Sequence, residues 1–272
     1  MVKRPVRPKL DLATQNEKIF EANAIARAQW KTSNVWVQRI AAILISRIGE
    51  NETEFRRQII SMSEIIPTEH GGMNYSIIKN LAQELGSQTV LTRVYGTEKD
   101  FVVHNVFQSG IRYYEKNHEI EICLNNDLRP FYLELKKNFV AYGLDEFLSL
   151  PSTYYQTLYK YIKSWESESY HAIRIEDLHR ILNTTKTHRD NYSNLDRKIL
   201  APAHECITKF TSLRYDYEPL KEGRKVAHIA FHIHSKPVIP RKVPKKLPKK
   251  KGRGGNDFSL KAPNKPGGNS VD

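Results

Sequence analysis

The chain has 272 residues, a formal net charge of +13, a hydrophobic fraction of 39% and a charged fraction of 27%. This length suffices for one large domain or two small ones. No apolar run approaches the roughly 18 residues of a membrane span, and the basic N-terminus lacks the apolar core of a secretory signal, so we expect neither.

The basic excess is concentrated at the two ends of the chain. Residues 1–10 carry a net charge of +4 and residues 236–272 carry +9, which leaves residues 11–235 with a net charge of zero. Basic ends of this kind bind polyanions through counterion release, so the charge favours a nucleic-acid partner. Cys123 and Cys206 have no neighbouring cysteine, so we expect small buried side chains in a reducing cytoplasm and no zinc site or disulfide.

A repeat organises the middle of the chain. The string "NYS" occurs at residues 74–76 and 191–193, and each copy precedes a helical pattern, a strand beginning at Thr89 or Thr211, a turn, and a returning strand. Amphipathic patterns typical of two helices also precede each copy, at residues 35–49 and 61–69 and again at 152–165 and 173–183. Each half is therefore predicted to be three helices followed by a two-stranded hairpin.

This pattern predicts an α+β fold of two tandem winged-helix domains related by an internal repeat, with a disordered basic C-terminal tail. The first domain spans 21–124 and is expected to provide dimerisation and an auxiliary DNA contact. The second spans 125–235 and is expected to be the main DNA-binding domain. Its opening segment, 125–150, is predicted to be a loop followed by a helix that packs between the halves. Residues 1–20 are predicted to be flexible, and the tail, 236–272, is too rich in Lys, Pro and Gly to form a core.

The third helix of the second half is the predicted base-reading element. Ser193 and Asp196 form a Ser-x-x-Asp pattern that favours a helix start. A stripe recurs every four residues and is predicted to be buried; it comprises Leu195, Ile199, Ala203 and Ile207. The opposite face presents Asn194, Arg197, Ala201 and His204, with Lys198 at its edge. Arg and Asn at a helix N-terminus can form bidentate contacts with guanine and adenine, although such a pair is also common on an ordinary solvated face. Pro202 is expected to kink the helix or end its first half.

The hairpin turn of the second half is predicted to be a basic wing that reaches DNA phosphates through Lys221, Arg224 and Lys225; a solvated turn is the alternative. Arg189, Tyr192 and Ser193, near the start of the helix, complete the predicted DNA-binding set. Secondary DNA contacts are predicted at Tyr75, Lys79 and Arg93 in the first half. That half is slightly acidic and the second slightly basic, so we expect the second to bind DNA more strongly.

Four stretches, in this order and spacing, resemble the Rep_3-type, iteron-binding plasmid replication initiators. They are "NAIARA" from Asn23, the segment from Leu124 to Ile162, "NYSNLDRKILAPAHECI" from Asn191 and "YEPLKEGRKVAHIAFHI" from Tyr217. The resemblance covers about residues 20–235, and the long basic tail departs from it.

The resemblance implies a sequence-specific initiator that is not an enzyme and needs no cofactor or metal. Such proteins bind directly repeated sites in double-stranded DNA at a plasmid origin as monomers. They help to open an adjacent AT-rich region, recruit the host replication initiator and helicase, and repress their own promoter as dimers. The base-reading helix of the family corresponds to Ser193–Lys198 and its wing to Lys221–Lys225. A bacterial, plasmid-encoded, cytoplasmic protein is the expectation.

Two alternatives stay open. A winged-helix repressor would have the same fold and the same residues. A metal-dependent strand-nicking enzyme would use His232 and His234, on one strand face with His228, as ligands, and Tyr155 or Tyr159 as nucleophile. Against the enzyme, that strand is the last before the tail, where a central strand would be expected, and the tyrosine helix is typical of a core. His104 and His118 are predicted to be lone surface histidines. The chain also lacks phosphate-binding motifs of the Gly-x4-Gly-Lys-Ser/Thr and Gly-x-Gly-x-x-Gly types.

Overall fold

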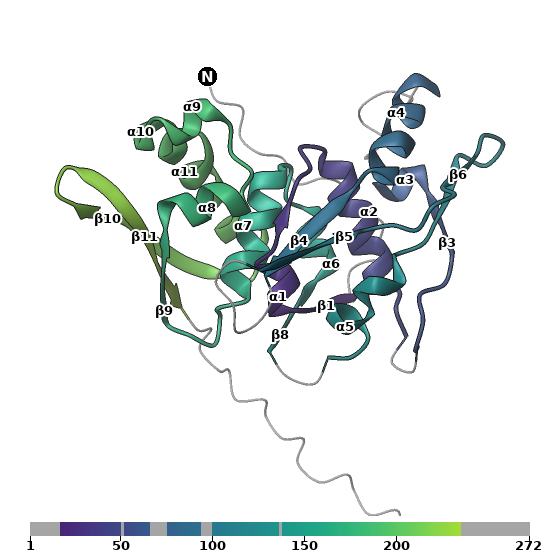
Figure 1. The fold of residues 1–272 in the computed structure, drawn as a ribbon, viewed down its shortest axis with the longest axis horizontal. Coiled ribbons are helices and arrows are strands. Elements are labelled where there is room, and N and C mark those ends of the chain that lie inside the picture. Colours follow the sequence, from purple (N-terminus) through teal and green to yellow (C-terminus); the bar gives the residue numbers. More distant parts are fainter. Residues whose placement is uncertain (1–16, 50–51, 66–74, 94–99, 136–137, 235–272) are drawn as a thin grey trace, which may run out of the picture. The chain divides into compact units, whose positions relative to one another are not determined.

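The structure is a computed structural model that describes residues 17–49, 52–65, 75–93, 100–135 and 138–234 (Figure 1). The tail that was predicted to be disordered, 236–272, lies outside the described residues, as does 1–16. Residues 18–20 belong to a strand and Ile19 is fully buried, so the prediction of a flexible segment up to residue 20 is wrong at its end. The predicted domain boundary between residues 124 and 125 stays a prediction. In the described part of the chain, no helix is long and apolar enough to cross a membrane.

The first half alternates short strands with helices. Its elements are β1 (Lys18–Ala22), α1 (Asn23–Ala26), β2 (Gln29–Trp30), α2 (Val35–Ser46), β3 (Gln58–Ser61), α3 (Met62–Ile65), α4 (Tyr75–Gly86), β4 (Thr89–Arg93), β5 (Phe101–Asn105), β6 (Arg112–Tyr114) and β7 (Glu119–Ile122).

A linking segment follows, and then the second half. Their elements are a 3-10 turn (Asn126–Leu128), α5 (Arg129–Tyr132), β8 (Phe139–Gly143), α6 (Leu144–Leu148), α7 (Thr153–Lys163), β9 (Tyr170–Arg174), α8 (Ile175–Ile181), α9 (Lys186–Arg189), α10 (Tyr192–Leu195), a π turn (Asp196–Leu200), α11 (Ala201–Phe210), β10 (Arg214–Glu222) and β11 (Lys225–His234).

The second half is a winged helix with a three-stranded sheet in the order β10-β11-β9. The predicted hairpin is present as β10 and β11, but β9 was not predicted, and its last two residues, Ile173 and Arg174, were assigned to the helix 173–183. Antiparallel pairing of β9 with β11 makes β11 the central strand, so the expectation that the histidine strand lies at an edge is wrong. Helix α8 packs on β9 and β11, while α11 packs on α7 and β10.

In the second half, β11 pairs both with its hairpin partner β10 and with β9. In the first half, two different strands make the corresponding two pairings. Strand β5 pairs with β4 to form the expected hairpin, whereas β7 pairs with β3, the strand that leads directly into α3. Strand β3 and helix α3 therefore correspond to β9 and α8. The three predicted helices are present, but Ser61 of the second belongs to β3 and its residues 66–69 lie outside the described residues. The single predicted hairpin is incomplete, because β3, β6 and β7 add further strands.

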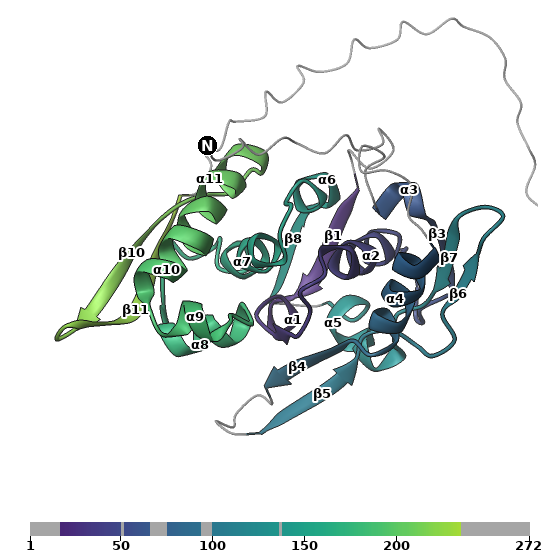
Figure 2. The same cartoon turned by 90° about the horizontal axis from the view of Figure 1, so that it is seen from above.

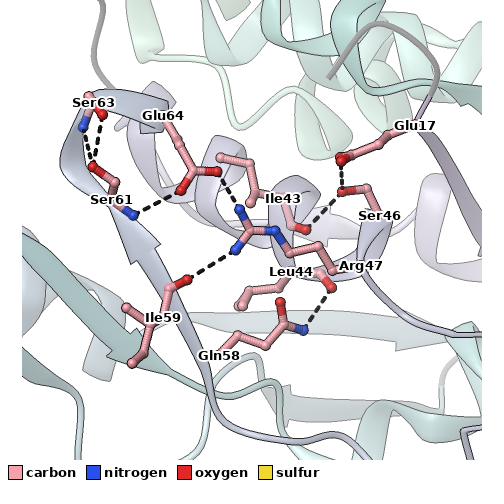
Figure 3. A network of polar contacts seen from close by, with 10 residues as sticks. All are labelled: Glu17, Ile43, Leu44, Ser46, Arg47, Gln58, Ile59, Ser61, Ser63 and Glu64. Atoms are coloured by element: carbon pink, nitrogen blue, oxygen red, sulfur yellow. Dashed lines mark hydrogen bonds and ion pairs between the residues drawn. The ribbon is translucent and has the colours of Figure 1, made fainter. Parts of the chain in front are cut away.

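The C-terminal end of α2 is tied to β3 and α3 by polar contacts (Figure 3). Arg47 donates to the carbonyl of Ile59 (3.0 Å) and forms an ion pair with Glu64. The other carboxylate oxygen of Glu64 accepts the N–H of Ser61 (2.9 Å). This is the carboxylate half of a capping box, and it stabilises the junction where the strand turns into the helix.

The linking segment joins the first strand to the second half. Strand β8, which sequence analysis missed, pairs antiparallel with β1. Glu21 of β1 is fully buried; it accepts a hydrogen bond from Tyr142 OH (2.9 Å) and lies 3.4 Å from Lys160 Nζ of α7. A buried carboxylate requires such partners because it has lost its hydration.

One continuous hydrophobic core runs through both halves. Cys123, which follows β7, and Cys206 in α11 are both buried and free, as expected. Burial raises the pKa of the Cys206 thiol to about 11. Each half therefore contains one protected, protonated thiol.

Candidate nucleic-acid interface

The segment from Tyr192 to Phe210 is one helical run made of α10, the π turn and α11. Its first N–H groups are capped by Asn191, whose side-chain oxygen accepts the N–H of Ser193 (2.9 Å). The capping pattern predicted from Ser193 and Asp196 is therefore wrong. Asp196 accepts a hydrogen bond from Tyr217 OH of β10 (2.6 Å), which links the helix to the wing strand.

The predicted buried stripe of this helix is confirmed, since Leu195, Ile199, Ala203 and Ile207 are each at most 1% exposed. On the other side, Arg197, Lys198 and Ala201 are exposed, as predicted. Asn194 is half-buried, and its Oδ1 lies 3.4 Å from Arg197 Nη2.

His204 does not belong to the exposed face, which corrects the prediction. Its Nε2 lies 2.8 Å from the carbonyl oxygen of Tyr215, and its ring packs edge-on against Tyr215 and Tyr217. Helical spacing predicted an outward-facing His204, but β10 covers that part of the helix. The face available to a partner therefore ends near Ala201.

The residues just before the helix and at its start are accessible to different degrees. Arg189, at the end of α9, and Ser193 are exposed, whereas Tyr192 is half-buried. Burial, reinforced by the negative charge of Asp196, raises the pKa of Tyr192 to about 12. Its hydroxyl is therefore protonated at neutral pH and can donate a hydrogen bond.

The wing is the β10–β11 hairpin, which extends beyond helices α8 to α11 (Figure 1 and Figure 2). Lys221, Arg224 and Lys225 are all exposed around its turn. Gly223 has φ +62°, a conformation that L side chains rarely adopt, so glycine permits this tight turn. The three cations that sequence analysis predicted for the wing thus share one loop.

A groove of about 860 Å³ lies between the helices and the wing. It brings Arg189 and Tyr192 together with Arg224 and Lys225, so four of the predicted residues line one surface. Arg180 of α8 also lines it, and sequence analysis missed this residue. Only the folded arrangement of α8 against the sheet reveals its position.

The secondary contacts predicted in the first half are partly described. Lys79 is exposed on α4. Tyr75 begins α4 and Arg93 ends β4, but their side chains lie outside the described residues. Lys79 does not line the groove of the second half, and all three contacts remain predictions.

The histidines of β11 pair with carboxylates. His232 Nε2 lies 3.0 Å from Glu218 Oε1, and His234 Nε2 lies 2.8 Å from Asp216 Oδ2. His228 Nδ1 lies 3.7 Å from Glu222 Oε1. Within the described ranges, no group of three or more His, Cys, Asp or Glu side chains is arranged to hold a metal ion.

The tyrosines proposed for the nicking alternative are poorly suited to attack phosphate. Tyr159 is fully buried and donates to Glu146 (2.6 Å), and burial together with that carboxylate raises its pKa well above the ordinary value. Burial also raises the pKa of Tyr155. Of the first-half histidines, His118 is exposed as predicted, and its Nδ1 lies 2.9 Å from Tyr113 OH. His104 is half-buried, and its Nε2 lies 3.1 Å from Thr92 Oγ1.

Comparison with known proteins adds independent observations. The family model described as "Initiator Replication protein, WH1" matches residues 18–163, and "Initiator Rep protein, WH2" matches residues 174–233. A "Probable replication protein rep" from Bifidobacterium longum (strain NCC 2705) is 25% identical over 139 residues, which are 51% of this chain and 46% of that protein. The match thus spans about half the length of this relative.

Among solved structures, the Pi initiator protein in complex with iteron DNA matches with a TM-score of 0.62 and 19% identity. The match covers 80% of this chain and 97% of that chain. At this identity the likeness concerns the fold, and it confirms two winged helices in tandem.

Proposed function

Because the chain belongs to the Rep_3-type family of initiator replication proteins, we propose that it starts plasmid replication by binding directly repeated origin sites, or iterons, in double-stranded DNA. The Pi initiator was crystallised in complex with iteron DNA, and the likeness of the two folds supports the proposal. The observation that carries it is the groove between α8–α10 and the wing, where Arg180, Arg189, Arg224 and Lys225 gather.

The groove suits a DNA backbone. Arg189 comes from the helices and Arg224 and Lys225 from the wing, so cations approach from two sides. Two acidic residues, Glu176 and Asp190, also line the groove. The Asp190 carboxylate pairs with Lys186 (2.5 Å), which offsets its repulsion of phosphate. Contacts from two sides fix the orientation of a duplex without determining its sequence.

Sequence discrimination is assigned to the exposed side of the π turn. Arg197 and Lys198 can donate to guanine O6 and N7, and Asn194 can pair with adenine at the edge of this surface. Ser193 and Tyr192 lie at the helix N-terminus, where hydroxyl donors and backbone N–H groups suit a phosphate.

The first winged helix is the proposed pairing surface for a homodimer in equilibrium with monomer. Strand β5 lies at the edge of its sheet, and Phe101, Val102 and Val103 are 60%, 43% and 54% exposed. An apolar edge strand is a ready partner for another chain. The dimer would repress the gene's own promoter, whereas the monomer would bind iterons, open the origin and engage the host initiator and helicase in the bacterial cytoplasm.

A DNase I footprint on the DNA flanking the gene tests this proposal. Several evenly spaced, protected direct repeats would support an iteron-binding initiator. A single inverted repeat over the promoter would favour a repressor and contradict the initiator role.

A control lane on the same denaturing gel contains protein, DNA and Mn²⁺ without DNase I. It stays free of breaks if the protein binds DNA without cutting it. A specific break there would instead support the nicking alternative and assign the β11 histidines a catalytic role.

A further inference from the structure

The helical run from Tyr192 to Phe210, which is the proposed recognition helix, contains a π turn where its basic side chains lie. The N–H of Ala201 donates to the carbonyl of Asp196, five residues earlier, where an α-helix would bond four residues earlier. Such turns are rare and are often found at functional sites. Arg197 and Lys198 lie within this turn, and both are exposed.

The spacing of the buried stripe explains why the helix needs a wider turn. Residues four apart in an α-helix drift by about 40°, so the stripe from Leu195 to Ile207 would drift by about 120°. Yet all four of its side chains are buried. A turn with one extra residue rotates the helix back by about 100° and keeps Leu195 in the core while Arg197 and Lys198 face outward.

Pro202 provides a local cause for the turn. Proline has no N–H, and its ring collides with the carbonyl four residues earlier in a regular α-helix, here that of Lys198. Pro202 lies in the first turn of α11, immediately after the π turn. The predicted disturbance of the helix therefore takes the form of a π turn, and the helix continues to Phe210.

A second contact holds the same turn. Asp196 is its first residue, and its carboxylate accepts the hydroxyl hydrogen of Tyr217 at 2.6 Å. Tyr217 belongs to β10, so the wing strand fixes the start of the turn while Pro202 disfavours an ordinary α-helical turn at its end.

We propose that Pro202 and Tyr217 are positioning residues for DNA site discrimination, because they hold the π turn that directs Arg197 and Lys198 toward the bases. The inference rests on the proposed function and deepens it. Neither residue needs to touch a base. Both act through the two basic side chains.

The test compares binding of the full-length protein to a footprinted site and to a scrambled duplex. Alanine at 202 restores the missing N–H and removes the ring, so the helix can adopt an α turn. We expect Pro202→Ala to reduce the ratio of specific to non-specific affinity by about 10-fold, the scale of one base contact, with non-specific affinity unchanged. Tyr217→Phe, which removes only the hydroxyl, should reduce the ratio in the same direction. Pro151→Ala and Tyr113→Phe, outside the candidate interface, are the matched controls and should leave it unchanged.

A double-mutant comparison separates positioning from a general structural effect. In an Arg197→Ala, Lys198→Ala background, which has no site preference left to lose, Pro202→Ala should leave the residual affinity for both duplexes unchanged. A further loss of affinity in that background, or an unchanged ratio in the single variants, would overturn the inference. If Pro202→Ala does not fold, the same affinity ratios measured for Tyr217→Phe test the inference. A wild-type protein without site preference would overturn the proposed function itself, and the inference with it.

Discussion

Arg197 is held loosely in the free protein. Its guanidinium lies 3.4 Å from Asn194 Oδ1, which is long for a hydrogen bond, and the side chain is exposed. A base can therefore replace this contact with little loss. A bidentate contact to guanine contributes about 1–3 kcal/mol of discrimination, so this one residue can account for much of the site preference.

Arg197→Ala should abolish the preference for the specific site while residual binding, driven by the basic ends, persists. A competition assay between specific and scrambled duplexes measures the ratio. Arg56→Ala removes an exposed arginine in the first half and should leave the ratio unchanged. Survival of site preference in Arg197→Ala would show that another element contacts the bases.

At the scale of elements, the wing and the recognition helix have different proposed tasks. The wing presents Lys221, Arg224 and Lys225 on a short turn and is tied to the helix by the Tyr217–Asp196 bond. Cations on such a loop contribute through counterion release, which depends on salt and not on base sequence. In the proposed function the helix supplies the discrimination, so the two contributions can be separated by experiment.

Replacing the three wing cations by alanine should weaken binding to specific and scrambled duplexes about equally. The slope of log affinity against log salt should become shallower by roughly 0.9 for each lost phosphate contact. Lys116→Ala, in the exposed turn between β6 and β7 of the first half, is the matched control. An unchanged slope in the triple variant would mean that the wing does not contact phosphate.

The elements also show which parts of the fold local sequence can predict. The recognition helix and the wing followed from period-four and period-two patterns together with a glycine turn, which are all local signals. Strand β9 was missed because Arg174 leads directly into α8 and no turn residue separates them. Its pairing partner, β11, lies more than 50 residues later. Strand β8 was missed for the same reason, since its partner is β1.

Local sequence signals likewise predict only part of the candidate site. Exposed cations near the helix start and in the wing follow from the sequence, whereas the groove that includes Arg180 requires the packing of α8 on the sheet. His204 was placed outward because helical spacing cannot show that Tyr215 and Tyr217 cover it.

At the scale of the whole molecule, a buried ion pair connects the first strand to the second half. Glu21 and Lys160 have side chains that are 0% and 8% exposed, and Tyr142 provides a further hydrogen bond to the carboxylate. Removing one partner from a buried pair leaves an uncompensated charge, which costs about 3–5 kcal/mol. Replacing both partners by neutral groups costs far less.

Lys160→Met should therefore lower the free energy of unfolding by about 3–5 kcal/mol, and the double variant Glu21→Gln, Lys160→Met should recover most of the loss. Urea denaturation measures both. Lys186→Met, which breaks an exposed pair with Asp190, should have a much smaller effect. A single variant as stable as the wild type would show that the pair does not stabilise the fold.

Deleting residues 236–272 should make the affinity for DNA less dependent on salt while preserving the preference for the specific site. The segment carries a net charge of +9, so its contribution is electrostatic and independent of sequence. Titrations of the full-length and shortened proteins over a range of salt concentrations check this. Equal slopes would mean that the tail does not touch DNA.

The two buried cysteines can be used to measure local opening of the structure. A thiol reagent can modify Cys123 or Cys206 only after the surrounding structure opens, so each modification rate measures the opening of one winged helix. Equal opening free energies would show that the halves open cooperatively. Unequal values would show that one winged helix can open while the other stays intact. Bound DNA that contacts the second half would then slow the alkylation of Cys206 more than that of Cys123, without any label added to the chain.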